Sequence, residues 1–329
     1  MVRRLFSILL LLIISIPILL AASMMMRRVR YFSMQQARAD APERETGLQK
    51  LRITSDGRVR TYCLYVPKSL DLSEMTPLVM VLHGAGGEGE MYLTRNGWEK
   101  QAELGRFIVV APDGLPARVR AVPNFLTNPR IWRTGQVSTA AVRSNIDDLK
   151  FLDDLFDRMQ SRFKIDSKRI FLCGHSNGSS MAFRYAASPN CRVAAVAMVA
   201  GQMTERDPIL KQPIPTLYLI GDKDPLNPLA GGIQKTPWNS REVPPVQNQL
   251  AEWAKGMGIR TQSVIRSDDR TKTVVEFGPS FQEWIIKGQG HMWPGGEEAG
   301  LPSRFVGPSL NSVDATHEIW KFFQSHPRA

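Results

Sequence analysis

The sequence predicts an α/β fold, with a mostly parallel central sheet and helices on both faces, for residues 50–329. Three observations support this fold class. Several short segments are continuously apolar, as strands are when helices cover both faces of a parallel sheet. These segments alternate along the chain with amphipathic helices, which is the order of a wound parallel sheet. No change of composition, internal repeat or low-complexity linker divides residues 50–329, so we expect one domain.

The first elements of this domain are a hairpin, two buried strands and a helix. Residues 50–67 form two strands on either side of Asp56-Gly57, a dipeptide that favours tight hairpin turns. Residues 77–84 (PLVMVLHG) and 106–114 (RFIVVAPDG) are apolar strands. Residues 145–163 form a helix, because apolar side chains recur there at helical spacing, at Ile146, Leu149, Leu152, Leu155 and Met159.

The second half of the domain continues the alternation. A strand at 169–176 leads into a helix at 177–188, and strands follow at 193–201 and 215–221. A loop rich in Pro and Gly spans 222–243, a helix covers 246–257, and three strands lie near 262–267, 273–277 and 283–288. The last helix covers 312–326, with Ser312 as its N-cap.

Residues 1–30 are predicted to be a signal peptide or an N-terminal membrane anchor. Residues 5–22 (LFSILLLLIISIPILLAA) carry no charge, and this run is at the lower edge of membrane-spanning length. Small residues at 21–23 would permit cleavage after Ser23, whereas the arginines at 27, 28 and 30 argue against it. We therefore favour a retained anchor over a removed signal. Either way the rest of the chain is expected outside the cytoplasm, secreted, periplasmic or tethered to the membrane by residues 5–22.

Residues 31–49 are predicted to be a flexible tether, because they show little apolar periodicity. The net charge of +11 is concentrated before the domain: residues 1–40 hold six Arg and one Asp. No basic run interleaved with aromatic residues remains, which argues against a nucleic-acid partner. The cysteines, Cys63, Cys173 and Cys191, are too few for a disulfide framework in a chain of 329 residues, and we expect free thiols.

Ser176 is the candidate nucleophile. It lies in Gly174-His175-Ser176-Asn177-Gly178, between an apolar strand and a helix. A Gly-x-Ser-x-Gly motif in this context predicts a sharp turn that exposes the serine hydroxyl at the carboxyl edge of a sheet. The motif alone is weak evidence, and a serine that only caps a helix is the alternative.

A nucleophilic serine needs a base, and His291 is the candidate. The other four histidines are placed less well: inside the turn, at the end of a strand, within the last helix and near the chain end (His175, His83, His317 and His326). His291 lies in GQGHMWPGG, a glycine-rich loop between the final strand and the last helix. Such a loop can bring an imidazole over the edge of the sheet.

The acid that orients the imidazole follows the strand at 215–221. Asp222 and Asp224 are both candidates. We prefer Asp224, because it lies far enough beyond Gly221 for the loop to turn back towards His291, whereas Asp222 is expected in the turn itself. The order Ser176, Asp224, His291 is that of the α/β-hydrolase fold.

The segment LHGAGG at 82–87 is the candidate for the rest of an oxyanion hole. A strand that ends in glycine-rich backbone leaves amide groups to point into a site, and such N–H donors stabilise a tetrahedral oxyanion. The two expected donors are the N–H groups of Ala85 and Asn177, with Gly86 as the reserve choice. A phosphate-binding loop is a weaker interpretation, because no Lys-Ser/Thr pair follows.

Together, LHGAGG, VVAPDG, GHSNGSSMAFRYA, GDKDP, GHMWPGG and IWKFF resemble the polyhydroxybutyrate depolymerase/feruloyl esterase-like group of α/β-hydrolases, related to carbohydrate esterase family 1. The similarity covers roughly residues 50–326 and keeps the order of the motifs. Departures surround the acid and the pocket wall: Gly178-Ser179 where many members have Gly-Gly, Ala85 where some have Cys, Ile220 where His is usual, and PLNPL after Asp224.

The resemblance implies a serine ester hydrolase with Ser176, Asp224 and His291 as triad. It implies no metal and no organic cofactor. The expected substrates are short-chain, feruloyl or acyl-saccharide, or hydroxyalkanoate esters, as small or oligomeric molecules. Trp132 and Trp293 are candidates for lining an aromatic acyl pocket, although tryptophans in large domains more often pack in the core. A prolyl-oligopeptidase-like peptidase and a non-catalytic binding protein on a hydrolase scaffold are the alternatives.

Overall fold

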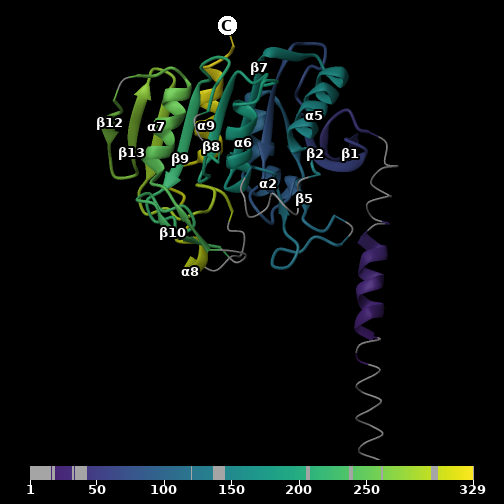
Figure 1. Cartoon of the computed structure of the whole chain (residues 1–329). Helices are drawn as coiled ribbons and strands as arrows, with labels where there is room; N and C mark the ends of the chain where they lie inside the picture. The colour runs from purple at the N-terminus through teal and green to yellow at the C-terminus, as the bar shows by residue number, and fades with distance from the viewer. Residues whose placement is uncertain are drawn as a thin grey trace, which may run out of the picture.

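The computed structural model describes residues 16, 19–31, 33, 43–119, 121–135, 145–204, 208–236, 240–260, 262–297 and 303–328. A ten-stranded sheet organises them (Figure 1). In spatial order its strands are β1 (Gly47–Ser55), β2 (Arg58–Val66), β4 (Ile108–Pro112), β3 (Thr76–Leu82), β7 (Ile165–His175), β8 (Ala195–Val199), β9 (Thr216–Gly221), β14 (Phe281–Ile286), β13 (Lys272–Gly278) and β12 (Val264–Asp268).

The centre of the sheet is parallel, and its two sides are antiparallel. Strands β4, β3, β7, β8, β9 and β14 run in one direction, whereas β1, β2, β13 and β12 pair antiparallel with their neighbours. The predicted α/β-hydrolase architecture is confirmed. In open sheets of this kind, sites form where the parallel strands end at their carboxyl edge.

Helices cover both faces, and each face has its own apolar core. One face packs against α5 (Asp148–Arg162), α6 (Asn177–Ala186) and α7 (Val246–Gly256), and the other against α2 (Gly89–Arg95), α3 (Trp98–Gly105) and α9 (Ala315–Gln324). In Figure 1, α5, α6 and α7 lie in front of the sheet and α9 behind it. The fully buried β3 serves both cores, because its side chains alternate between the faces.

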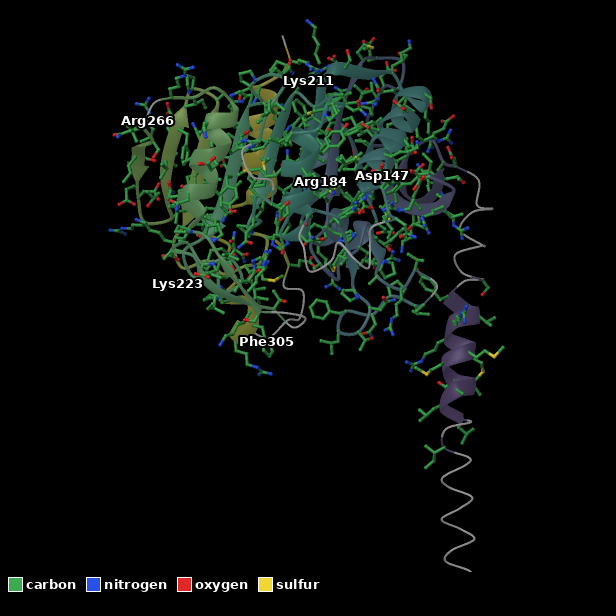
Figure 2. All side chains as sticks on the ribbon, in the orientation of Figure 1. Asp147, Arg184, Lys211, Lys223, Arg266 and Phe305 are labelled. Atoms are coloured by element: carbon green, nitrogen blue, oxygen red, sulfur yellow. The ribbon has the colours of Figure 1, made fainter. Side chains whose placement is uncertain are left out.

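The outer surface carries the charged side chains. Lys211, Lys223 and Arg266 are exposed and project outward around the sheet (Figure 2). Phe305 is an exception, since this exposed aromatic residue lies on the short helix α8 (Ser303–Val306).

The carboxyl edge carries small elements that the sequence did not predict. The loop expected at 222–243 contains a hairpin, β10 (Gly232–Lys235) and β11 (Ser240–Val243). A second pair, β5 (Leu115–Pro116) and β6 (Arg130–Ile131), follows β4. In Figure 1, β5, β10 and α8 all lie at the lower edge. The strands of these pairs are two and four residues long, too short to leave a periodic pattern in the sequence.

Three local predictions can be compared with the structure, and two of them are confirmed. The hairpin is confirmed: Ser55 pairs with Arg58, and the turn residues Asp56 and Gly57 both have positive φ, 50° and 66°, as a tight two-residue turn requires. The predicted start of the last helix, with Ser312 as its N-cap, was wrong. Helix α9 begins at Ala315, and its N-cap is Asp314 rather than Ser312, because the Asp314 carboxylate accepts from His317 N–H at 3.0 Å. The cysteines are free thiols, as predicted.

The segment before the domain is described only in part. Residues 19–31 are helical and extend away from the sheet in Figure 1, and the Tyr31 hydroxyl accepts from Arg130 at 3.1 Å. Among the described residues no helix is both long and apolar enough to cross a membrane. Residues 5–15, 17–18 and 34–42 lie outside the described part, so the predicted signal or anchor and most of the tether stay predictions. The tether ends earlier than predicted, since Gly47 already pairs with Val66 in β1.

Glu283 on β14 is a buried carboxyl group without an ionic partner among the described residues. Its side chain is fully buried, the Gln247 amide donates to one oxygen, and the other oxygen has no hydrogen-bond partner. Burial disfavours the charged form and raises the pKa of Glu283 to about 7. A carboxyl group whose pKa is raised on folding stabilises the protein at low pH and loses that contribution as pH rises towards the folded pKa.

We predict that Glu283→Gln removes this pH dependence. The amide keeps the shape and the hydrogen bond but never ionises. At pH 8 the variant should exceed the parent in free energy of unfolding by on the order of 3 kcal/mol, and the difference should vanish near pH 4, below the unfolded pKa. Urea unfolding at the two pH values measures it. Glu252→Gln, at an exposed glutamate on α7, is the matched control. A parallel pH trend in parent and Glu283→Gln would contradict the prediction.

Candidate active site

Ser176 lies at a strained turn between β7 and α6. Its backbone has φ 53° and ψ −120°, a region that residues with a side chain rarely adopt. The two glycines of the motif permit the close packing that holds this turn. A Cβ atom on Gly174 would overlap the carbonyl of Gly178, and one on Gly178 would overlap the carbonyls of Leu82 and His83. The turn therefore lies directly against the end of β3.

The structure brings Ser176, His291 and Asp224 together. Ser176 Oγ lies 2.8 Å from His291 Nε2, and His291 Nδ1 lies 2.8 Å from Asp224 Oδ2. Because a carboxylate oxygen accepts, Nδ1 carries the hydrogen, and Nε2 is left to accept from the serine hydroxyl. The Asp224 side chain is fully buried and that of His291 is 8% exposed.

The two candidate acids have different positions. Asp224 Oδ1 accepts from the N–H groups of Leu226 and Asn227, both at 2.8 Å, which leaves Oδ2 for His291. Asp222 follows directly after β9, and its carboxylate accepts from Gly288 N–H at 2.7 Å. Asp224, and not Asp222, is therefore the carboxylate in contact with the imidazole.

A buried relay joins the His291 loop to the loop after β3. The Tyr92 hydroxyl accepts from Gly84 N–H at 3.0 Å and lies 2.6 Å from His175 Nδ1. His175 Nε2 lies 2.6 Å from the His291 carbonyl, which only accepts, so Nε2 carries the hydrogen and Tyr92 donates to Nδ1. Burial lowers the pKa of His175 to about 3, and the neutral ring keeps this arrangement at ordinary pH.

Tyr92 was not among the site residues predicted from the sequence. It lies on α2, for which no helix was predicted at residues 89–95. Its neighbours Leu93 and Trp98 are also buried, and this apolar spacing was the signal available. The structure also shows why His175 and His83 are not the base: both are buried with their ring nitrogens occupied, those of His83 by Gly84 O and Gly114 N–H.

The N–H groups near the expected oxyanion hole differ in whether they already have an acceptor in the protein. In the loop after β3, Gly84 N–H donates to Tyr92, Gly86 N–H to Arg130 O at 2.7 Å, and Gly87 N–H to Gly84 O. Among the described residues the N–H of Ala85 has no such acceptor. The same holds for Asn177 N–H in the first turn of α6. The reserve choice, Gly86, is corrected, because its N–H is already bonded.

The two tryptophans are not at an open pocket wall, which corrects that expectation. Trp132 is fully buried, and its indole N–H donates to His83 O at 2.8 Å. Trp293 is 3% exposed, and its indole donates to the Thr316 hydroxyl at 3.0 Å. Both rings pack in the interior with their polar atoms bonded to the protein.

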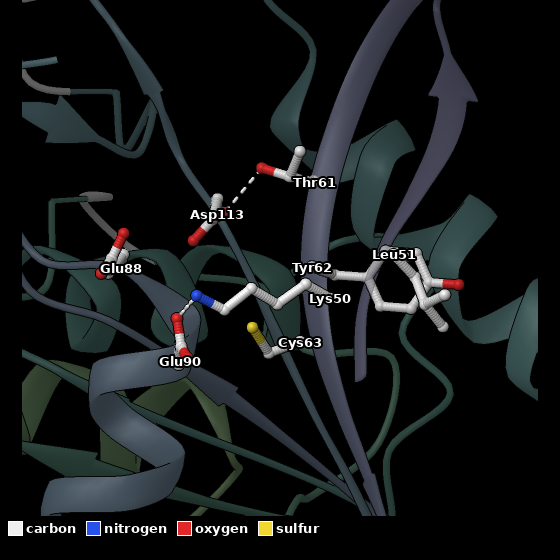
Figure 3. Close-up of a pocket in the computed structure, with 8 residues that line it drawn as sticks. All are labelled: Lys50, Leu51, Thr61, Tyr62, Cys63, Glu88, Glu90 and Asp113. Carbon is white, nitrogen blue, oxygen red and sulfur yellow. Dashed lines mark hydrogen bonds and ion pairs between the residues drawn. The ribbon is translucent and has the colours of Figure 1, made fainter. Parts of the chain in front are cut away.

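The hollow shown in Figure 3 is separate from this site. It lies between β1, β2 and α2, and it is lined by Lys50, Leu51, Thr61, Tyr62, Cys63, Glu88, Glu90 and Asp113. Its volume of about 10 Å³ is close to the space of one water molecule. Asp113 there accepts from Thr61 and from Gly89 N–H, so it binds the protein rather than a ligand. In the described part of the chain no three His, Cys, Asp or Glu side chains gather to ligate a metal ion.

The comparisons with known proteins point to one family. Residues 54–284 match the family described as "Putative esterase". The chain is 28% identical over 262 residues to "Putative esterase NocK" of Nocardia uniformis subsp. tsuyamanensis, which covers 73% of this chain and 72% of that protein. It is 29% identical over 182 residues to feruloyl esterase C of Emericella nidulans, covering 53% of this chain and 58% of that relative.

Solved structures show the same fold. An acetyl xylan esterase from Aspergillus awamori superposes with a TM-score of 0.56 at 15% identity, over 84% of this chain and 99% of that one. The poly(3-hydroxybutyrate) depolymerase LpqC from Bordetella parapertussis has a TM-score of 0.50 at 17% identity, over 75% and 86% of the two chains. The resemblance expected from the sequence motifs is confirmed.

The buried relay generates a stability prediction. Tyr92→Phe removes one hydroxyl and leaves both Gly84 N–H and His175 Nδ1 without a partner. Unpaired buried groups cost about 1–3 kcal/mol each, so we expect the free energy of unfolding to fall by about 2–4 kcal/mol in urea. Tyr65→Phe is the matched control, because its half-buried hydroxyl contacts Glu103 near the surface, and the loss there should stay below about 1 kcal/mol. Equal losses in the two variants would refute the role of the relay.

Proposed function

Because this chain belongs to the esterase family and is a carboxylic ester hydrolase, we propose that it cleaves esters through a covalent acyl-enzyme on Ser176. The observation that supports this mechanism is the pair of 2.8 Å contacts that join Ser176, His291 and Asp224 at the carboxyl edge of the sheet. Three side chains from different loops meet there in the order that nucleophilic catalysis needs.

The proposed reaction has two halves. Ser176 Oγ attacks the ester carbonyl while His291 Nε2 accepts the hydroxyl proton, and Asp224 stabilises the imidazolium. The N–H groups of Ala85 and Asn177 donate to the oxyanion. The C–O bond to the alcohol then breaks, and Nε2 returns the proton to the leaving oxygen. In the second half, His291 Nε2 deprotonates a water molecule, which attacks the acyl carbonyl. The bond from the acyl carbon to Ser176 Oγ then breaks, Nε2 returns the proton to Oγ, and the acid is released.

The substrate class is proposed from the relatives. One relative is named feruloyl esterase C, and the match covers 58% of it. Its name supports feruloyl or acyl-saccharide esters as substrates of this chain. Short-chain and hydroxyalkanoate esters are further candidates. Hydrolysis rates on a matched panel of feruloyl, acetyl and 3-hydroxybutyryl esters test this. A chain that hydrolyses aminoacyl amides faster than every ester would favour the peptidase alternative instead.

We also place the domain outside the cytoplasm. The support is the uncharged run at residues 5–22 followed by arginines at 27, 28 and 30, which is a pattern of export or membrane anchoring. Fractionation of cells that make the full chain separates the two forms: an anchored protein stays with membranes, and a cleaved one is released. Recovery of the full-length protein in the cytoplasm would refute this location.

The triad assignment is tested by three substitutions. Ser176→Ala should lower kcat on p-nitrophenyl acetate by about 10⁴-fold or more, because the nucleophile is lost. Asp224→Asn should lower kcat by about 10³–10⁴-fold, because the imidazole loses the partner that fixes its tautomer. Asp222→Asn is the matched control and should keep kcat near the parent value. The mechanism is wrong if Ser176→Ala stays active, and the acid is misassigned if the two aspartate variants exchange their effects.

A further inference from the structure

We propose that Asn177 and Trp132 are positioning residues that hold the two oxyanion donors at a fixed separation. This inference rests on the proposed function, because it takes the N–H groups of Ala85 and Asn177 as the donors. Ala85 follows β3 and Asn177 follows the neighbouring strand β7, but both lie beyond Leu82 and Gly174, where the pairing of these strands ends. Donors must lie about 2.7–3.1 Å from the oxyanion to be effective, which makes that distance decisive.

The Asn177 side chain bridges to the backbone of Trp132. Its Oδ1 accepts from Trp132 N–H at 2.6 Å, and its Nδ2 donates to Trp132 O at 3.4 Å. The side-chain amide thus pairs with both backbone groups of one residue, much as a neighbouring strand would. This bridge starts from the same residue whose N–H is a proposed donor.

Trp132 continues the connection to the other donor. Its indole N–H donates to His83 O at 2.8 Å, two residues before Ala85. The ring is fully buried beside the His83 imidazole, with 5.1 Å between ring centres. On the other side of Ala85, Gly86 N–H donates to Arg130 O at 2.7 Å. Segment 130–132 therefore holds the loop on both sides of the donor.

We call the Asn177 side chain together with segment 130–132 the oxyanion clamp. The clamp is itself fixed to the body. Arg130 donates to Gly114 O at 3.2 Å, and Arg133 N–H donates to Asp148 Oδ2 at 2.7 Å. Asp148 in turn pairs with Arg60 at 2.8 Å, and both side chains are buried. Because the clamp is bonded to the rest of the domain, it can hold the loop after β3 at a fixed distance from the end of β7.

The clamp also explains two features that chemistry alone does not require. The residue after the nucleophile needs only its backbone N–H to act as a donor, yet here it is an asparagine whose side-chain oxygen and nitrogen both bond Trp132. Trp132 contributes an indole donor that a purely packing ring would not need. Both features follow if the spacing of the donors is what these side chains set.

The test uses Asn177→Ala and Trp132→Phe, since neither removes a proposed donor. Asn177→Ala keeps the backbone N–H and loses the bridge, whereas Trp132→Phe keeps a packed ring and loses the indole donor. We expect each to lower kcat on p-nitrophenyl acetate by about 10–100-fold with KM changed by less than about threefold. The double variant should be little worse than the worse single one, because both break the same connection. The pH profile should be unchanged, because His291 and Asp224 are untouched.

An inhibitor comparison separates positioning from general damage. Propylboronic acid, which has the same alkyl chain as butyrate, forms a B–O bond to Ser176 Oγ, whose proton passes to His291 Nε2, and becomes a tetrahedral anion. Butyrate instead binds as a planar product. The inhibition constant for the boronic acid should rise by the same 10–100-fold as kcat falls, and that for butyrate should stay within about threefold. Equal weakening of both inhibitors, or an unchanged boronic acid constant, would overturn the proposal.

Two matched controls and one discriminating variant complete the design. Asn190→Ala and Trp284→Phe, at an exposed asparagine and at a half-buried tryptophan on β14, should keep parental kcat. Trp132→Phe carries the test if Asn177→Ala does not fold, and urea unfolding of each variant shows whether it does. If Ser176→Ala is inactive but Asn177→Ala and Trp132→Phe are fully active, the clamp is rejected and the proposed function is kept. An active Ser176→Ala would reject the proposed function itself.

Discussion

The site depends on one backbone turn, at Ser176. Its positive φ is unfavourable for a residue with a side chain by on the order of 1–3 kcal/mol, and surrounding contacts must maintain it. Ser176 N–H donates to Val199 O at 2.8 Å, which joins the turn to the end of β8. The two flanking glycines let the turn pack against β3. The hydroxyl lies beyond the carboxyl end of β7, in contact with His291 Nε2.

Buried polar contacts then bring the other groups to the serine. The Tyr92–His175 relay ties the His291 loop to the loop after β3, and the backbone N–H groups of Leu226 and Asn227 hold Asp224. In a low-dielectric interior such contacts have little freedom to rearrange, so they fix direction as well as distance. The reacting groups lie on loops, yet their positions come from the rigid sheet beneath them.

The sequence motifs have structural roles as well as chemical ones. His175 lies next to the nucleophile in sequence, but its ring does not contact Ser176 as a base. It donates instead to the backbone carbonyl of His291. Asn177 bonds the backbone of Trp132, and Trp132 bonds His83 in the loop that carries Ala85. The residues that set the geometry thus alternate along the chain with those proposed to do the chemistry.

Sequence patterns were enough to predict the strands of the main sheet, the helices α5, α6, α7 and α9, the tight turn at Asp56-Gly57 and the candidates Ser176 and His291. These depend on local periodicity, on glycine chemistry and on a choice among few histidines, all of which are visible in one dimension. The three-dimensional arrangement was needed to choose between Asp222 and Asp224, to exclude Gly86 as a donor, and to show that Trp132 and Trp293 lie in the interior. Those outcomes depend on which atoms meet across the carboxyl edge. A hydrogen bond between residues far apart in the chain has no local pattern, because folding alone sets the distance between its donor and acceptor.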